Sequence, residues 1–314
     1  MSEEREFPPA PFLLAPMAEI SHRAFRELIE KFGGCDGYFT EMISASALLA
    51  EGQFEKWYTD SGPKPEKLVF QIVGSDIEKI AKASAILDQM ECAGIDINMG
   101  CSAPIIRKTG AGAAWMKDID RAGELVSCVR KAVKRRLSVK LRIGYKDDFE
   151  YLVRFCRRLE AEGTELIILH PRTVMEKFKR LARWDYVGAL RKELKIPVAG
   201  NGDIASAEGI VRRTLECNAV MVGRAAVRSP WIFAEAKSPK SSSAPSIEET
   251  GLLFIELLAK YQPPEFHVSR AMRFFNYFCD NLKWGTFLKN SLNREKTLSG
   301  IEETWLGYFR ENDR

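Results

Sequence analysis

The sequence predicts an α/β fold, a (β/α)8 TIM barrel followed by a small all-helical C-terminal domain. Short apolar runs alternate eight times with helix-like segments over the first three quarters of the chain, and such a barrel needs about 250 residues. A Ser- and Pro-rich stretch follows, and beyond it apolar residues recur at helical spacing without a strand signal. We therefore expect a barrel over residues 1–237, a linker over 238–246 and a helical domain over 247–314.

The predicted strands are short apolar runs bounded by turn residues or by the start of a helical pattern. Ser21 is expected to cap the helix after the first strand, and Asp76 the helix after the third. Aromatic residues are concentrated in the C-terminal helices, at Phe274-Phe275 and Tyr277-Phe278. The eight strands are expected at residues 12–15, 37–40, 68–73, 95–98, 138–143, 165–170, 196–200 and 218–222.

Composition limits the classes of protein to which the chain could belong. Of its 314 residues 46% are hydrophobic, which is ordinary for a globular protein. The net charge of +4 permits a polyanionic partner without requiring one. Seven cysteines without a C-x-x-C pair indicate a reducing compartment and argue against a disulfide framework or a zinc site. The charged N-terminus and the lack of a long apolar segment predict a cytoplasmic protein that does not enter a membrane.

The strand ends carry polar side chains that the mouth of a barrel would bring together, and active sites of such barrels lie there. Gln71 and Lys140 lie within otherwise apolar strands, where an unpaired polar group is costly. Each needs a buried ion-pair partner or a bound ligand, and several such residues at one mouth favour a ligand. The residues at the strand ends are Met17, Glu41, Gln71, Asn98, Cys101, Lys140, His170, Asn201, Asp203, Gly223 and Arg224.

The fourth strand ends in Asn98-Met99-Gly100-Cys101, which places an amide and a thiol in the loop that follows it. Gly100 allows a tight turn, so Cys101 could face a pocket. A single cysteine is more often a small buried hydrophobic residue than a reactive one. The polar residues at the other strand ends favour a reactive role for Cys101.

The last two strand ends carry Asn201-Gly202-Asp203 and Gly223-Arg224. The loops after strands seven and eight, with a nearby helix N-terminus, commonly hold a phosphate in these barrels. Glycines let backbone N–H groups approach phosphate oxygens, and Arg224 can add charge-assisted bonds. Ordinary turn glycines would explain either pair alone. Both pairs together indicate a phosphorylated cofactor.

Taken together, these residues resemble the tRNA-dihydrouridine synthase family, whose members are flavin-dependent (β/α)8 barrels with a C-terminal helical domain. The resemblance covers nearly the whole chain. It rests on short motifs whose order and placement are specific. The matching segments are 15–18 (APMA), 71–75 (QIVGS), 96–101 (DINMGC), 139–144 (VKLRIG), 170–173 (HPRT), 199–204 (AGNGDI), 221–226 (MVGRAA), 230–233 (PWIF) and 270–273 (RAMR).

The resemblance implies roles for individual residues. Cys101 would be the proton donor, Asn98 would contact the uracil, and Arg172 would contact the nucleotide phosphate. Lys140 and His170 would face the flavin ring system. No residue is expected to bind a metal. FMN would be held by Pro16, Met17, Ala18, Gln71, Lys140, His170, Asn201, Gly202, Asp203, Gly223 and Arg224.

The activity that the resemblance implies has two half-reactions. NADPH or NADH reduces FMN, and the flavin then transfers hydride to C6 of a tRNA uridine while Cys101 protonates C5. The target base must leave its stack to reach a barrel mouth, at a cost of a few kcal/mol. The rest of the tRNA therefore needs a second binding surface, which we expect to be the helical domain.

The sequence departs from the family pattern in several places, and one of them is Pro171, where a small residue is usual. Ser102 follows Cys101 where the family usually has proline, and Arg180 stands where a glycine is common, in an unusually basic loop. Two other functions are consistent with the sequence. One is a flavin-dependent dehydrogenase of a free pyrimidine such as dihydroorotate. The other is a tRNA-binding relative that has lost its chemistry.

Overall fold

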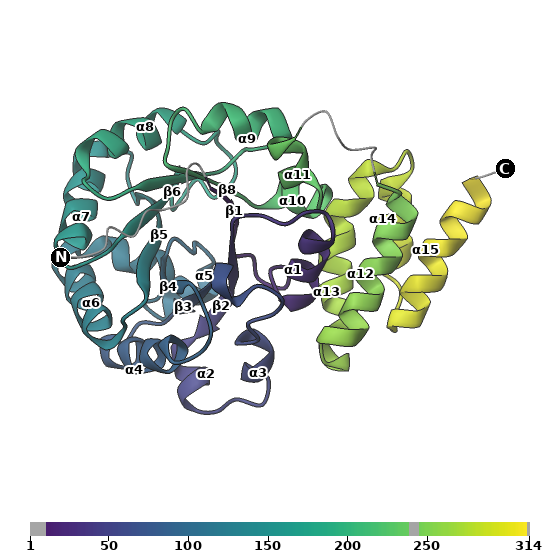
Figure 1. The fold of residues 1–314 in the computed structure, drawn as a ribbon, viewed down its shortest axis with the longest axis horizontal. Helices are drawn as coiled ribbons and strands as arrows, with labels where there is room; N and C mark the ends of the chain where they lie inside the picture. The colour runs from purple at the N-terminus through teal and green to yellow at the C-terminus, as the bar shows by residue number, and fades with distance from the viewer. Residues whose placement is uncertain (1–10, 239–244, 313–314) are drawn as a thin grey trace.

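The computed structural model describes residues 11–238 and 245–312, so most of the predicted linker lies outside the described residues. Eight parallel strands form a closed barrel in which each strand pairs with its neighbours in sequence and β1 pairs with β8 (Figure 1). The strands are β1 (Phe12–Leu14), β2 (Gly37–Ser44), β3 (Leu68–Val73), β4 (Gly94–Met99), β5 (Arg136–Gly144), β6 (Leu166–Thr173), β7 (Val198–Asn201) and β8 (Ala219–Val222).

Helices follow the strands and surround the barrel, and four further helices are grouped at one side of it, with α15 farthest from the barrel (Figure 1). The barrel helices are α1 (Arg23–Lys31), α2 (Ala45–Leu49), α3 (Glu55–Tyr58), α4 (Ile77–Asp88), α5 (Pro104–Lys108), α6 (Ile119–Ala132), α7 (Phe149–Ala161), α8 (Trp184–Glu193), α9 (Ala207–Arg213), α10 (Arg224–Arg228) and α11 (Ile232–Lys237). The C-terminal helices are α12 (Ile247–Tyr261), α13 (Pro264–Phe278), α14 (Gly285–Leu292) and α15 (Leu298–Asn312). Within the described residues, none of the helices combines the length and apolar character needed to span a bilayer.

The predicted fold class is confirmed, and all eight predicted strands are present. β2 continues to Ser44 and β6 to Thr173, each beyond the predicted end. Asp76 caps α4 by accepting a bond from the backbone N–H of Lys79 at 2.9 Å. The prediction for Ser21 was wrong. His22 is the N-cap of α1, whereas the Ser21 hydroxyl accepts a 2.9 Å bond from the backbone N–H of Met17 and so holds the loop after β1.

Alternation along the strands gives the barrel two apolar layers. Side chains such as Leu13, Phe39 and Ile168 fill the inside of the barrel. The opposite faces of the strands pack against the surrounding helices and form the larger core, which continues into the C-terminal helices.

The C-terminal helices pack directly on the barrel through aromatic rings. α12 lies against α1 (Figure 1), and the rings of Phe254 and Phe274 stack with centroids 3.8 Å apart. Phe274 also contacts Phe25 of α1, with ring centroids 6.2 Å apart. The helical region and the barrel therefore share one core, and their division into separate functional units stays a prediction.

A buried ion pair joins the two parts. Nη2 of Arg270 on α13 lies 3.0 Å from Oε2 of Glu41 within β2, and both side chains are almost fully buried. Removing one partner of such a pair would leave an uncompensated buried charge. Glu41 therefore has the buried ion-pair role that the sequence left open for strand-end residues, and it does not line the cavity at the mouth.

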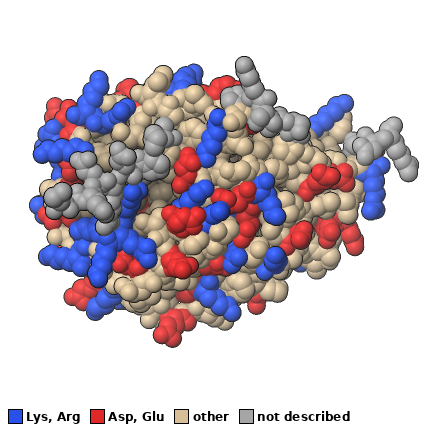
Figure 2. Space-filling model, viewed as in Figure 1, with Lys and Arg blue, Asp and Glu red and all other residues tan. Residues whose placement is uncertain are grey.

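The surface carries both signs of charge. Figure 2 shows Lys and Arg gathered over one side of the barrel, with acidic and basic residues mixed over the C-terminal helices. The visible face of the helical region therefore has no patch of a single sign that would identify a nucleic-acid surface on its own.

Candidate active site at the barrel mouth

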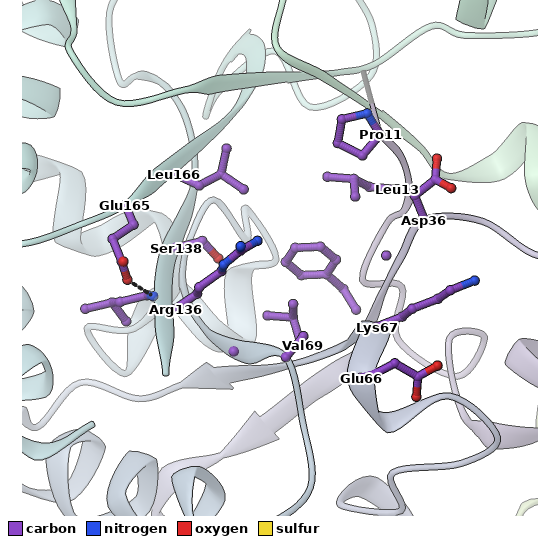
Figure 3. A pocket seen from close by; sticks show the side chains of 15 residues that line it. Pro11, Leu13, Asp36, Glu66, Lys67, Val69, Arg136, Ser138, Glu165 and Leu166 are labelled. Carbon is purple, nitrogen blue, oxygen red and sulfur yellow. Dashed lines mark hydrogen bonds between the residues drawn. The ribbon is translucent and has the colours of Figure 1, made fainter. Parts of the chain in front are cut away.

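The barrel has a cavity at each end. The smaller, of about 140 Å³, lies where the strands begin, and Leu13, Val69 and Leu166 point toward one another across it (Figure 3). The larger, of about 660 Å³, lies where the strands end. Its size is within the range of small-molecule and cofactor sites. The larger cavity is the candidate active site.

All fourteen residues predicted to bind cofactor or substrate, or to act in catalysis, line this larger cavity. They come from seven different strand ends, which only the closed barrel brings together. Their individual roles stay predictions. They are Pro16, Met17, Ala18, Gln71, Asn98, Cys101, Lys140, His170, Arg172, Asn201, Gly202, Asp203, Gly223 and Arg224.

Lys140 links β5 to the end of β7. Its Nζ donates to Oδ1 of Asn201 at 3.1 Å, and Nδ2 of Asn201 donates to the carbonyl of Met221 at 2.8 Å. Burial, together with the nearby Arg142 guanidinium, lowers the pKa of Lys140 to about 8. This amine thus lies near the point where it changes charge at physiological pH.

Arg172 links the ends of β6 and β7. Its Nη2 donates to both carboxylate oxygens of Asp203, at 2.6 and 2.5 Å, and its Nη1 lies 2.9 Å from Nε2 of His170. Because a guanidinium only donates, His170 must accept with Nε2 and carry its proton on Nδ1. Burial and the surrounding cations, Lys140 first, lower the pKa of His170 well below its usual value. The imidazole is therefore neutral.

The turn after β7 has the conformation that its glycine permits. Gly202 has φ of 125°, and a Cβ there would lie 3.1 Å from the His170 ring. Asp203 adopts φ of 52°, an uncommon left-handed conformation for a residue other than glycine. Its carboxylate also accepts a bond from the backbone N–H of Ala182 at 2.8 Å, so the turn is fixed from both sides.

The lining of the cavity is strongly basic. Six basic residues contribute to it, and Asp203 is the one acidic residue of the described lining. Asp203 is already bonded to Arg172, with Arg224 3.7 Å away. The site therefore attracts an anionic ligand. The six basic residues are Lys140, Arg142, Arg172, Lys177, Arg224 and Arg273.

The loop that carries Cys101 is held by side chains from two strands. Oδ1 of Asn98 accepts bonds from the backbone N–H groups of Gly100 at 3.2 Å and Cys101 at 2.9 Å. Nε of Arg142 donates to the carbonyl of Gly100 at 3.0 Å. The half-exposed Cys101 side chain lines the cavity.

Sequence reasoning missed several residues of this cavity, among them Arg142, Arg273, Tyr277 and Phe178. Arg142 lies two residues beyond Lys140, a spacing that places both on one face of a strand and could have revealed it. Arg273 and Tyr277 come from α13, and no local pattern indicates that this helix reaches the mouth. Phe178 lies in the basic loop after β6, with its ring centroid 4.7 Å from the guanidinium carbon of Arg224.

The barrel, the added helices and the basic cavity define a class of (β/α)8 barrel enzymes whose active site lies at the strand ends. Residues 13–300 match the family described as Dihydrouridine synthase (Dus). The chain therefore belongs to the dihydrouridine synthase family. Dihydrouridine is a reduced uridine, which places the protein among the oxidoreductases.

Relatives across bacteria support the assignment. A probable tRNA-dihydrouridine synthase of Aquifex aeolicus (strain VF5) is 34% identical over 253 residues, covering 78% of each chain. The tRNA-dihydrouridine synthase B of Pseudomonas putida is 30% identical over 253 residues, covering 79% of this chain and 75% of that protein. A solved complex of 2-naphthoyl-CoA reductase with 2-naphthoyl-CoA shares the fold, with a TM-score of 0.54 at 11% identity over 73% of this chain and 50% of that chain.

Proposed function

We propose that this protein is a tRNA-dihydrouridine synthase that uses FMN and NAD(P)H to reduce a uridine of tRNA. The observation that carries the proposal is the joint placement of the Cys101 thiol, the Lys140 amine and the Asn98 amide in one basic cavity at the barrel mouth. Membership of the dihydrouridine synthase family supplies the reaction. It also removes the main ground for a dehydrogenase of a free pyrimidine.

The cavity fits a flavin mononucleotide in charge and size. Its surplus of basic side chains matches a phosphate, and Gly223 follows β8 directly while Arg224 begins α10. Lys140 and the neutral His170 are the polar groups that would face the flavin ring system. FMN reduced by NAD(P)H would supply the two electrons that convert uridine to dihydrouridine.

The protein's own groups would bind the uracil and donate the proton. Asn98 uses one hydrogen of its Nδ2 for Gln71 and has a second available for a uracil carbonyl. Cys101 would donate a proton to C5 of the uracil. Lys140, while charged, would stabilise negative charge at the flavin or at a uracil oxygen.

The C-terminal helices would bind the body of the tRNA. α13 supports this assignment because it supplies Arg273 and Tyr277 to the cavity. The bond of 2.6 Å between Arg273 and Glu19 and the buried pair of Arg270 with Glu41 fix α13 against the mouth. A tRNA seated on α13 could thus present one extruded nucleotide to Cys101.

An anaerobic titration tests the proposal. The flavin of the purified protein is reduced, tRNA lacking dihydrouridine is added, and recovery of the oxidised flavin's visible absorption is followed. We expect rapid recovery with tRNA and none with free uracil or orotate. Recovery with a free pyrimidine and none with tRNA would assign the protein to the small-molecule dehydrogenases. A protein that binds tRNA but cannot be loaded with FMN would be a non-catalytic relative.

A further inference from the structure

A chain of buried polar side chains lies beneath the Cys101 loop and ends on its backbone. Asp96 lies beside Gln71 of β3 and Ser138 of β5 in the strand register. Its carboxylate accepts bonds from Nε2 of Gln71 at 2.7 Å and from Oγ of Ser138 at 2.6 Å. Oε1 of Gln71 then accepts from Nδ2 of Asn98 at 2.8 Å. Asp96 and Gln71 have no exposed surface.

The two ends of this chain leave only one orientation for the amides between them. An ionised carboxylate only accepts, so Gln71 must present its nitrogen to Asp96 and its oxygen to Asn98. Asn98 must then present its nitrogen to Gln71 and its oxygen to the loop. At the other end, the backbone N–H groups of Gly100 and Cys101 only donate. Both ends therefore require the same direction of donors and acceptors.

The loop depends on that direction. The backbone carbonyls of Gly100 and Cys101 have other partners. The carbonyl of Gly100 accepts from Arg142, and that of Cys101 accepts from the backbone N–H of Ala113. The N–H groups of the same two residues are bonded to Asn98. If the Asn98 amide rotated, its NH2 group would face these N–H groups, and buried donors without acceptors are costly.

We propose that Asp96 is a positioning residue for Cys101, because it sets the direction of the Gln71 and Asn98 amides and thereby holds the loop that carries the thiol. Its effect on turnover rests on the proposed function. Its effect on the position of the loop does not depend on the proposed function, and the effects on turnover and on the loop can be measured separately.

The test is Asp96→Asn, which keeps the shape but offers a donor as well as an acceptor, so that either amide direction becomes possible. Iodoacetamide labelling of Cys101 is followed by peptide mass spectrometry in protein saturated with FMN, with the half-exposed Cys128 as internal reference. We expect Cys101 labelling to change at least about threefold relative to Cys128, because the loop loses its fixed acceptor.

Two further variants separate direction from general damage. In Asp96→Asn/Gln71→Glu, the acceptor-only group moves to position 71, where it can accept both from the amide introduced at position 96 and from Asn98, and we expect labelling to return to the wild-type rate. Ser138→Ala removes the other partner of Asp96 without changing the amide direction, and it should leave labelling unchanged. Equal labelling in the wild type and Asp96→Asn would overturn the proposal, as would a double variant no closer to wild type than the single one.

Folding and function give independent outcomes. If Asp96→Asn is insoluble, Gln71→Met breaks the chain while Asp96 keeps its carboxylate and its bond from Ser138. Unchanged Cys101 labelling in that variant would overturn the proposal. Turnover of tRNA should fall about tenfold in Asp96→Asn while flavin reduction by NADPH stays within about twofold. Altered labelling with unchanged uridine reduction would support the positioning of Cys101 and refute its role as proton donor.

Discussion

The two ends of the barrel are built from the same eight strands, yet they differ in what their polar side chains do. At the strand starts, Asp36 bonds to Lys237 at 2.7 Å, and Glu165 bonds to Arg130 at 2.8 Å. The dashed line in Figure 3 shows Glu165 also accepting from the backbone N–H of Leu137. Opposite charges there are paired with one another and hold the turns between elements.

At the strand ends the balance is different. Basic residues exceed acidic ones six to one in the lining, and Lys140 bonds to the neutral Asn201. Such a concentration of like charges destabilises the folded chain unless a ligand compensates it. The end of the barrel where the strands begin, here called the closed end, is therefore organised for stability. The end where the strands finish, the open end, is organised for an anionic ligand.

The largest effect on activity is expected from a substitution of Cys101 at the open end of the barrel. We expect Cys101→Ala to keep its flavin and its oxidation of NAD(P)H, but to lose at least about 100-fold in dihydrouridine formed in tRNA, because it removes the proton donor. Product is measured by nucleoside mass spectrometry of the modified tRNA. Cys128→Ala removes the other half-exposed thiol and should have no effect. Normal product from Cys101→Ala would show that another group protonates C5.

The features predicted from the sequence are those encoded locally. Apolar runs and turn residues located all eight strands, and polar side chains at strand ends located the cavity, because neighbouring strands must end at the same edge. The role of Glu41, ion-pair partner or ligand-binding residue, could not be predicted in this way, because its partner Arg270 reaches it only through the packing of α13. Arg142 was missed although its spacing from Lys140 places both residues on one face of a strand. Its hydrogen-bond partners, the backbone carbonyls of Gly100, Thr173 and Lys177, are brought together only by the folded loops.

A smaller effect is expected from pH. The pKa of Lys140 is lowered to about 8, so the amine is charged below that pH and neutral above it. If the charge assists flavin reduction, the rate with NAD(P)H should fall about tenfold from pH 7 to pH 9, following the protonated fraction. Stopped-flow absorbance measures this rate.

The matched variant for this profile is Lys140→Arg, which stays protonated throughout and should flatten the profile above pH 8. A wild-type rate that is constant from pH 7 to pH 9 would show that the charge of Lys140 does not contribute to flavin reduction.

The smallest effect on activity is expected at the closed end of the barrel. Leu166→Ala would enlarge the cavity drawn in Figure 3 and should lower the free energy of unfolding by about 3 kcal/mol. Activity per folded molecule should change less than about twofold, because Ile168 and Met221 separate Leu166 from the mouth within the barrel interior. Leu190→Ala is the matched control, since this fully buried leucine on α8 packs outside the barrel. If the tRNA turnover of Leu166→Ala were well below that of Leu190→Ala at equal stability, the closed end would contribute to catalysis. The two ends of the barrel would then not have separate roles.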